Sequence, residues 1–433
     1  MTLPWASLVC LLVGALVVIA FATPLTKQPW VLTGLAMAAA VASAFFSAHL
    51  DGSRMVVVHA VAIFLLIALL LMPRLELHVD QQRPEAVALL LLAGVGTIVL
   101  ATGGDLLQLV IGMETLSLSS VLLVAMGWGQ APAEAAFKYF VLAAVSLAAL
   151  VYGLGLIYFS TGSVAFPDLS RGAPNLVLLA GVVLMTAGFI FELALVPLHW
   201  GALDAYTAAA PGAAGAVMAL SKLGAILAIV RLAPLGGSSF LFVVGMVGLL
   251  TAVWATIAAL SQREIRRLLA YSAIAHAGFL AMAAGSGDAG RPAAIFYVVV
   301  YGATAMLVFA SLAGLGPEPI SFAELPARLG VQRSLALCFG LMSLAGIPPL
   351  PGFWAKLALF GPTWRALGPV PTIIGIAAAV AAAVYYLAPI PDLWNGLKLP
   401  SRRAAGNAGV VLAALTVLLL TVVPGYLWSV LGA

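Results

Sequence analysis

Charged side chains are scarce in this sequence. Only 8% of the 433 residues are Asp, Glu, Lys or Arg, whereas 64% are hydrophobic, and the mean hydropathy is +1.17. This composition offers too little polar surface to coat soluble domains of the same total length. The gaps between the long apolar runs are mostly short, so no sizeable domain outside the membrane is expected. The composition therefore predicts an integral membrane protein that functions inside the bilayer.

Cysteine is nearly absent as well. Cys10 and Cys338 lie in apolar runs and form no CxxC pair, and no two histidines have the helical spacing of haem ligands. We therefore expect no iron–sulfur, haem or zinc site, and no cofactor or metal in this chain. The net charge of +4 is scattered, and no basic run with interleaved aromatics favours nucleic acid as a partner. Any redox chemistry is expected to belong to a partner subunit.

Long apolar runs fill most of the chain. A helix needs about 20 apolar residues to cross roughly 30 Å of hydrocarbon. By this criterion the sequence predicts an all-α membrane protein with about 14 transmembrane helices. The predicted spans are 5–22, 29–49, 55–72, 86–102, 106–127, 135–159, 176–197, 212–233, 239–260, 268–285, 293–315, 334–360, 368–389 and 409–430.

Sixteen of the 19 basic residues lie outside the deep part of these spans, and they are unequally distributed. Loops after odd-numbered spans hold eleven, namely Lys27, Arg74, Arg83, Arg263, Arg266, Arg267, Arg328, Arg333, Lys398, Arg402 and Arg403. Loops after even-numbered spans hold five, namely Arg54, Arg171, Arg231, Arg291 and Arg365. By the positive-inside rule, the odd loops face the cytoplasm, and both termini lie on the outer (periplasmic) side of the cell inner (plasma) membrane.

The three basic residues left inside the predicted spans are all lysines: Lys138, Lys222 and Lys356. A buried lysine can lose its proton, whereas an arginine stays charged. Two carboxylates accompany them, Glu114 in the fifth span and Glu192 in the seventh. Each buried charge costs roughly 2.5 to 3.5 kcal/mol, so compensation is required. It can be static ion pairing or a hydrated relay whose members exchange protons.

Local context separates the strongest relay candidates from the rest. Glu114 is followed by a polar face that could hold water, formed by Thr115, Ser117, Ser119 and Ser120. Lys222 has no residue three or four positions away that could neutralise it, so its partner must come from another helix.

Two other candidates have simple structural explanations. Glu134 lies four residues before Lys138 and could form a surface pair with that lysine. His276, in YSAIAHAGF, could be a core histidine that is hydrogen-bonded to Ser272.

Proline interrupts two of the predicted spans. The seventh contains GFIFELALVPLHW and the twelfth contains GLMSLAGIPPLPGFWAKLALF, so prolines lie close to Glu192 and Lys356. Proline removes an amide donor and leaves a carbonyl that protein or water must satisfy. Discontinuous helices in both halves of a chain are typical of transporters built from inverted repeats. We predict two inverted five-helix repeats, with segments 1–84, 85–235, 236–390 and 391–433.

Several sequence stretches between about residues 85 and 390 match one known family. They are GMETLSLSS, EAAFKYFVLAA, VPLHW, LSKLGAILAIVRL, LSQREIRRLLAYSAIAHAGF and SLAGIPPLPGFWAKL. In their order and spacing the sequence resembles the antiporter-like membrane subunits of proton-pumping NADH:quinone oxidoreductase (complex I), most closely subunit N. Subunits of Mrp-type antiporters and membrane-bound hydrogenases are related to this family.

The resemblance implies a proton-translocating subunit of a translocase, with no redox centre of its own. Its expected partners are other membrane subunits of a complex I-like assembly, the lipid bilayer, protons and internal water. The residues that match the family's path or border it are Glu114, Lys138, His199, Lys222, His276 and Lys356.

One residue departs from the family pattern. Glu192 stands in the span 7 motif, where the family usually has a lysine. The usual acid and base of spans 5 and 7 thereby become two acids, unless Glu192 turns toward Lys138 or Lys222. This departure keeps two alternatives open: a subunit of an Mrp-type cation/proton antiporter or membrane-bound hydrogenase-type complex, and a structural scaffold subunit that does not pump.

Overall fold

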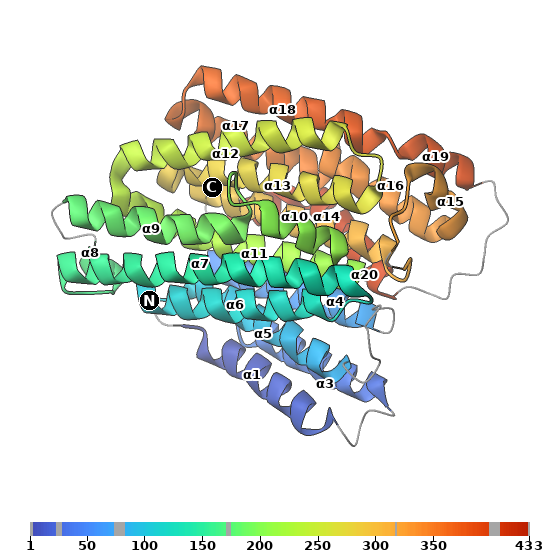
Figure 1. Ribbon diagram of the computed structural model, residues 1–433, viewed down its shortest axis with the longest axis horizontal. Helices are drawn as coiled ribbons and strands as arrows, with labels where there is room; N and C mark the ends of the chain where they lie inside the picture. Colours follow the sequence, from blue (N-terminus) through green and yellow to red (C-terminus); the bar gives the residue numbers. More distant parts are fainter. Residues whose placement is uncertain are drawn as a thin grey trace.

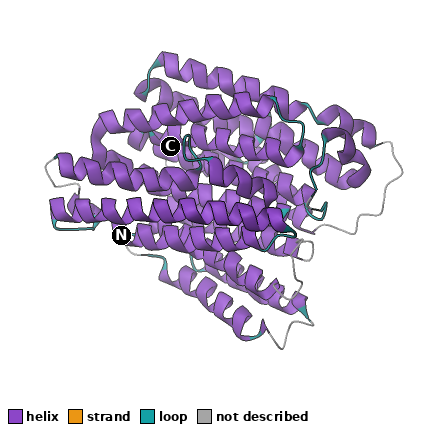
Figure 2. Cartoon of the chain, viewed as in Figure 1, coloured by secondary structure: helices purple, strands orange, loops and turns teal. Residues whose placement is uncertain are grey.

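The computed structural model describes residues 3–22, 28–72, 83–169, 175–316, 318–397 and 408–431. Over these residues the chain is helical, and it contains no β-strand beyond two isolated bridges (Figure 2). Six basic residues that entered the predicted orientation lie outside the described residues, namely Lys27, Arg74, Arg171, Lys398, Arg402 and Arg403.

The helices follow one another with short connections, and many of their axes run side by side across the molecule (Figure 1). In chain order they are α1 (Trp5–Ala20), α3 (Pro29–Phe45), α4 (Gly52–Leu71), α5 (Arg83–Thr102), α6 (Leu106–Ala125), α7 (Gln130–Thr161), α8 (Phe166–Leu169), α9 (Leu176–Leu193), α10 (Trp200–Ala208), α11 (Pro211–Leu232), η3 (Ala233–Gly236), α12 (Gly237–Leu260), α13 (Ile265–Ala284), η4 (Gly287–Gly290), α14 (Arg291–Leu312), η5 (Phe322–Glu324), α15 (Leu325–Arg328), α16 (Val331–Ala345), α17 (Pro351–Ala366), α18 (Pro369–Leu387), α19 (Ile390–Gly396), α20 (Ala408–Val422) and α21 (Pro424–Val430).

Length and composition make this a multi-pass membrane protein. Within the described ranges, nine helical segments are long and apolar enough to cross a bilayer, or ten if α20 and α21 form one bent span. One of the nine, Pro211–Leu260, has 50 residues. At 1.5 Å per residue it would extend about 75 Å, far more than the roughly 30 Å of hydrocarbon. The turn η3 divides it into α11 and α12, and Gly237, the residue directly after that turn, has a φ of 78°.

Burial separates central helices from peripheral ones. Every residue of α14 from Ala293 to Leu312 is buried, and α11 and α13 are buried along almost their whole length. In contrast, α7 and α18 expose large apolar side chains such as Phe159 and Val380. Because a bilayer solvates apolar side chains, such exposed faces fit contact with lipid or with other membrane subunits.

Close glycine contacts bring two pairs of neighbouring helices together. A Cβ atom added to Gly248 of α12 would lie 2.6 Å from the Gly278 carbonyl oxygen of α13, and one added to Gly278 would lie 2.5 Å from the Gly248 oxygen. Gly96 of α5 and Gly112 of α6 face each other in the same way, at 2.7 and 3.0 Å. Small residues allow this approach, and van der Waals packing between helices is a main source of stability in lipid.

The structure breaks both helices in which the sequence has proline. The seventh predicted span, 176–197, ends its helix at Leu193, and α10 begins only at Trp200. The twelfth, 334–360, is divided into α16 and α17 between Ala345 and Pro351.

A third break was not predicted. The expected continuous span 409–430 bends by 78° between α20 and α21. Pro424 is the first residue of α21, and it has no amide hydrogen with which to continue the α20 hydrogen-bond ladder.

The glycine contacts generate a stability prediction. Gly278→Ala places a methyl group against backbone atoms of α12 that cannot move independently, so we expect a loss of about 1 to 3 kcal/mol of unfolding free energy. Gly361→Ala is the matched control, because no atom lies within 4 Å of its added Cβ. Thermal unfolding of the detergent-solubilised protein, followed by tryptophan fluorescence, measures both. Equal Tm values for the two variants would contradict the prediction.

Candidate functional site

Lys222 lies in the middle of the bundle, in α11, and its side chain has no exposed surface. Its Nζ donates to the Leu193 carbonyl oxygen at 3.4 Å and to the Tyr206 hydroxyl at 3.5 Å. The ammonium also lies 5.1 Å from the centre of the Tyr206 ring, within the range of a cation–π interaction. The sequence predicted that the partner of Lys222 comes from another helix. The structure shows two such partners, the Leu193 carbonyl at the end of α9 and the Tyr206 hydroxyl of α10.

Lys356 makes the same kind of contact in the other half of the chain. This lysine of α17 is buried, and its Nζ donates to the carbonyl oxygens of Leu344 at 2.9 Å and Ala345 at 2.8 Å. Leu344 and Ala345 are the last two residues of α16.

Both lysines therefore bind carbonyls that proline leaves free. In a continuous helix, these carbonyls would accept from the amides four residues later. Those residues are Pro197, Pro348 and Pro349, which have no amide hydrogen. The C-terminal end of a helix also carries partial negative charge, which favours a cation there. The broken helices α9 and α16 thus supply the oxygen ligands for the buried ammonium groups.

Glu192 lies beside the first break and is completely buried. Its Oε1 accepts a hydrogen bond from the Tyr139 hydroxyl at 3.3 Å, while its Oε2 has no hydrogen-bond partner in the described part of the chain. The carboxyl group interacts electrostatically with both Lys222 and Glu114. Glu192 thus has a base and an acid among its charged neighbours.

Unpaired hydroxyls surround this part of the site. Ser117 lies close to Glu192, and Ser221 lies close to Tyr206. Among the described residues, neither serine hydroxyl has a hydrogen-bond partner. Buried polar atoms are normally hydrogen-bonded to protein or to ordered water, so this region suits internal water.

His276 of α13 is held by two tyrosines. The hydroxyl of Tyr386 lies 2.9 Å from Nε2, and the hydroxyl of Tyr297 lies 2.8 Å from Nδ1. Tyr386 also hydrogen-bonds to the Ser272 hydroxyl. Since neutral imidazole has one donor and one acceptor nitrogen, one tyrosine donates to the ring and the other accepts from it. His276 interacts electrostatically with both Lys222 and Lys356, so it lies between the two buried lysines in the sequence of charges.

Electrostatic interactions link five predicted site residues one to the next, and we call this set the central row. In order they are Glu114, Glu192, Lys222, His276 and Lys356, from helices α6, α9, α11, α13 and α17. Both halves of the chain contribute to it.

Two predicted site residues lie outside this row. The Lys138 side chain is half-exposed and pairs with Glu134 at 2.8 Å and Asp204 at 3.2 Å, which is the surface arrangement that the four-residue spacing allowed. The His199 ring packs 4.3 Å from the ring of Trp254, and its Nδ1 has no hydrogen-bond partner among the described residues.

Sequence reasoning missed the tyrosines of the site. The buried tyrosines that contact or border the central row are Tyr139, Tyr206, Tyr297, Tyr301 and Tyr386. Tyrosine usually marks the ends of transmembrane helices, where its hydroxyl reaches water. A tyrosine deep inside an apolar run needs a buried hydrogen-bond partner. The position of these tyrosines within the predicted spans could therefore have indicated that they belong to the site.

Among the described residues, no group of three His, Cys, Asp or Glu is placed to hold a metal ion.

Comparisons with a protein family and with a curated relative agree on the family to which this sequence is similar. The family described as NADH:quinone oxidoreductase/Mrp antiporter, TM, matches residues 103–382. NADH-quinone oxidoreductase subunit N of Acidithiobacillus ferrooxidans is 32% identical over 374 residues, which cover 80% of this chain and 76% of that protein.

Solved structures share the same fold. A chain of respiratory complex I from Thermus thermophilus with bound aureothin superposes with a TM-score of 0.83 and 27% identity, covering 98% of both chains. A chain of the membrane-bound sulfane sulfur reductase, an archaeal respiratory membrane complex, gives a TM-score of 0.86 at 23% identity, covering 98% of this chain and 96% of that one.

The tyrosine contacts of His276 can be tested by stability. Tyr386→Phe leaves Nε2 buried without its partner, so we expect a loss of about 1 to 3 kcal/mol of unfolding free energy. Tyr385→Phe is the control, because the His276 ring is hydrogen-bonded to Tyr386 and Tyr297 and not to this adjacent buried tyrosine. Thermal unfolding should separate the two variants by several degrees. A Tyr385→Phe variant as unstable as Tyr386→Phe would show that the His276 contact does not stabilise the fold.

Proposed function

This chain belongs to the NADH:quinone oxidoreductase/Mrp antiporter family of membrane proteins, and on that premise we propose that it is a proton-translocating subunit of a complex I-type NADH:quinone oxidoreductase, similar to subunit N. The observation that carries the proposal is the central row, in which each titratable group interacts with the next and two lysines bind the ends of broken helices. A purely structural role does not require such a linked set of buried titratable groups from five helices. The energy for transport comes from a redox step in a partner subunit.

The proposed mechanism moves charge along the central row. Protonation or deprotonation of Glu192 changes the field at Lys222, and a change at Lys222 in turn alters the field at His276 and Lys356. The tyrosines and unpaired serines, with internal water, provide the hydrogen bonds through which protons pass. Lys138 and His199 lie outside this relay.

The two halves support the predicted inverted repeats. Helices α5–α11 and α12–α18 have the same order, with the fourth long helix broken in each half at α9/α10 and α16/α17. An isolated antiparallel bridge joins the residue before the second helix to the segment after the third in both halves, Asp105 with Ala165 and Glu264 with Ser321. We propose fourteen crossings, with repeats at 85–235 and 236–390 flanked by 1–84 and 391–433.

Cellular placement and partners follow from the same proposal. We place the chain in the cell inner membrane, with both termini on the outer side, as the distribution of basic residues predicts. Its partners are other membrane subunits of the assembly. An Mrp-type antiporter or membrane-bound hydrogenase-type complex is the alternative setting, because the family description covers both oxidoreductase and antiporter subunits.

Lys222 gives the most direct functional test. Lys222→Ala interrupts the central row, so we expect proton pumping to fall at least about tenfold while the complex still assembles. Pumping is measured by fluorescence quenching in inverted membrane vesicles during NADH oxidation. Lys138→Ala is the matched control and should pump like the parent, because this lysine forms a surface ion pair. Unchanged pumping in Lys222→Ala would favour the scaffold alternative.

Glu192 tests the departure from the family pattern. Glu192→Gln keeps the shape of the side chain and the contact with Tyr139, but an amide does not exchange a proton in the physiological range. We expect pumping to fall about tenfold or more. Glu134→Gln, at an exposed acid, should leave pumping unchanged. If Glu192→Gln pumps normally in the same vesicles, Glu192 is a structural acid and not a relay member.

A further inference from the structure

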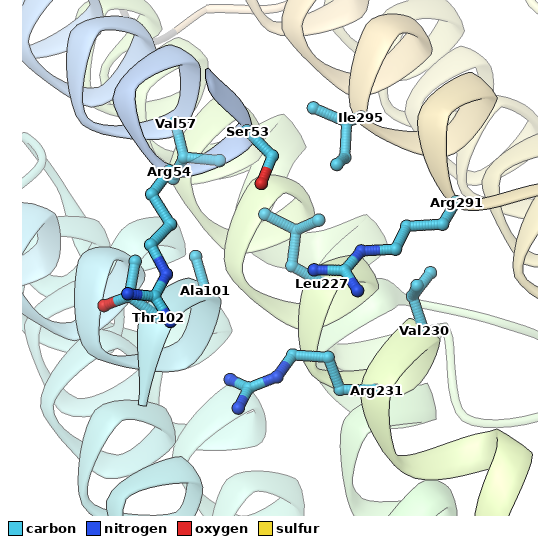
Figure 3. Close-up of a pocket in the computed structure, with 10 residues that line it drawn as sticks. All are labelled: Ser53, Arg54, Val57, Ala101, Thr102, Leu227, Val230, Arg231, Arg291 and Ile295. Carbon is cyan, nitrogen blue, oxygen red and sulfur yellow. The ribbon is translucent and has the colours of Figure 1, made fainter. Parts of the chain in front are cut away.

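Three arginines from three helices line one pocket at the ends of their helices (Figure 3). Arg54 lies in the first turn of α4, Arg231 in the last turn of α11, and Arg291 at the start of α14. Ser53 and Thr102 also line the pocket, and none of its described lining residues is acidic. The central row does not include any of these residues, so the pocket is a separate feature of the molecule.

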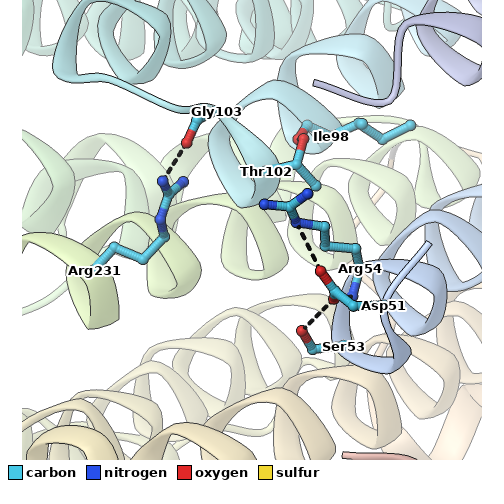
Figure 4. Close-up of polar contacts among 7 residues, drawn as sticks. All are labelled: Asp51, Ser53, Arg54, Ile98, Thr102, Gly103 and Arg231. Carbon is cyan, nitrogen blue, oxygen red and sulfur yellow. Dashed lines mark hydrogen bonds and ion pairs between the residues drawn. The ribbon is translucent and has the colours of Figure 1, made fainter. Parts of the chain in front are cut away.

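The guanidinium groups of Arg231 and Arg291 have few hydrogen-bond partners among the described residues. Arg54 forms an ion pair with Asp51, with 3.2 Å between Nε and Oδ2, and Arg231 donates to the Gly103 carbonyl (Figure 4). The second terminal nitrogen of Arg231, Nη1, is buried without a hydrogen-bond partner in the described ranges. Arg291 makes no hydrogen bond or ion pair within the described residues, although it interacts electrostatically with Arg231.

The nearby carboxylates do not balance this charge. Asp51 forms an ion pair with Arg54 and accepts a hydrogen bond from the Ser53 hydroxyl. Asp105 interacts electrostatically with Arg231, but its two oxygens accept from the backbone and side-chain nitrogens of Gln108, both at 2.8 Å. Arg54 and Arg291 both repel Arg231 across a pocket whose described lining has no acidic residue, so an anion in the pocket would stabilise all three.

Other buried arginines show what a purely structural arrangement looks like here. Arg333, for example, donates to the carbonyls of Ser311 and Ala313 at the end of α14, where one cation meets one helix C-terminus. Arg231 has only one such carbonyl, and a backbone carbonyl does not compensate the charges of its two arginine neighbours. The trio therefore needs a different explanation from that of Arg333.

The residues that line the pocket suggest the chemistry of its ligand. Guanidinium groups present forked donors that match the oxygens of a phosphate. Apolar side chains of Val57, Leu227, Val230 and Ile295 line the same pocket, so a ligand with an oxyanion and an attached hydrocarbon would meet suitable groups on both parts. An anionic phospholipid carries such an oxyanion in its headgroup, with hydrocarbon attached.

We propose that the pocket formed by Arg54, Arg231 and Arg291 binds a phosphate oxyanion, carried either by the headgroup of an anionic phospholipid or by a free phosphate. A bound oxyanion accepts hydrogen bonds from Arg231 Nη1 and from Arg291, and it joins the ends of α4, α11 and α14 on one side of the molecule.

The test uses the full chain within its membrane complex, with Arg291→Gln and Arg231→Gln as variants. The control is Arg365→Gln, which removes an exposed arginine from the last turn of α17, away from the pocket but on the same predicted side. Phosphatidylglycerol retained from defined vesicles is quantified by native mass spectrometry, with phosphatidylcholine vesicles for comparison. Radiolabelled inorganic phosphate in equilibrium dialysis forms the second arm.

Each pocket variant should weaken binding about fivefold, because one cation near an anionic headgroup contributes about 1 kcal/mol. Loss of phosphatidylglycerol in both variants, with Arg365→Gln unchanged, supports the site with a lipid headgroup. If the pocket variants lose binding of labelled phosphate but retain phosphatidylglycerol, the site is supported with a soluble phosphate as its ligand. Unaltered binding in Arg291→Gln, or an equal loss in Arg365→Gln, overturns the proposal. Arg291→Gln decides the outcome if Arg231→Gln fails to fold, because Arg291 has no hydrogen bond to lose within the described residues.

Discussion

The binding of lysine ammonium groups to carbonyls freed by proline is the interaction on which the interior of this protein depends. A buried charge costs roughly 2.5 to 3.5 kcal/mol on insertion scales, and a hydrogen bond to a charged group contributes about 1.5 to 3 kcal/mol. The two short bonds of Lys356 therefore offset its burial. Lys222, whose two contacts are 3.4 and 3.5 Å long, is less well compensated and depends more on the charge of Glu192. Broken helices and buried lysines thus require each other: without the lysines the carbonyls would lack donors, and without the breaks the ammonium groups would lack acceptors.

The polar interior also explains why tyrosine is placed so deep. Helices α11, α13 and α14 are buried along almost their whole length, so their polar side chains depend on partners inside the protein. Tyrosine carries a hydroxyl on an apolar ring, so it extends a hydrogen-bonded path without adding charge. His276 shows the result, because its two nitrogens meet two tyrosine hydroxyls and its charge neighbours are the two lysines.

Lysine and arginine have separate locations in this chain. The lysines of the central row can change protonation state, whereas the arginines remain charged and lie at helix ends. Arg333 is satisfied by carbonyls there, and the Arg54, Arg231 and Arg291 pocket concentrates positive charge at one place. A single chain thereby uses permanent charge at its edges and titratable charge in its interior.

The sequence by itself determined the membrane class, the all-helical fold and two of the three helix breaks, because hydropathy and proline act locally along the chain. It also identified Glu114, Glu192, Lys222, His276 and Lys356, since an ionisable group in an apolar run is visible without knowledge of the fold. Only the tertiary structure decided which of these groups meet. Lys138 and Lys222 both stand in apolar stretches of the sequence. In the structure, Glu134 and Asp204 pair with Lys138 at the surface, whereas the end of α9 and Tyr206 contact Lys222 in the interior. The tyrosine partners and the arginine pocket also come from the fold alone, because each is assembled from helices far apart in the sequence.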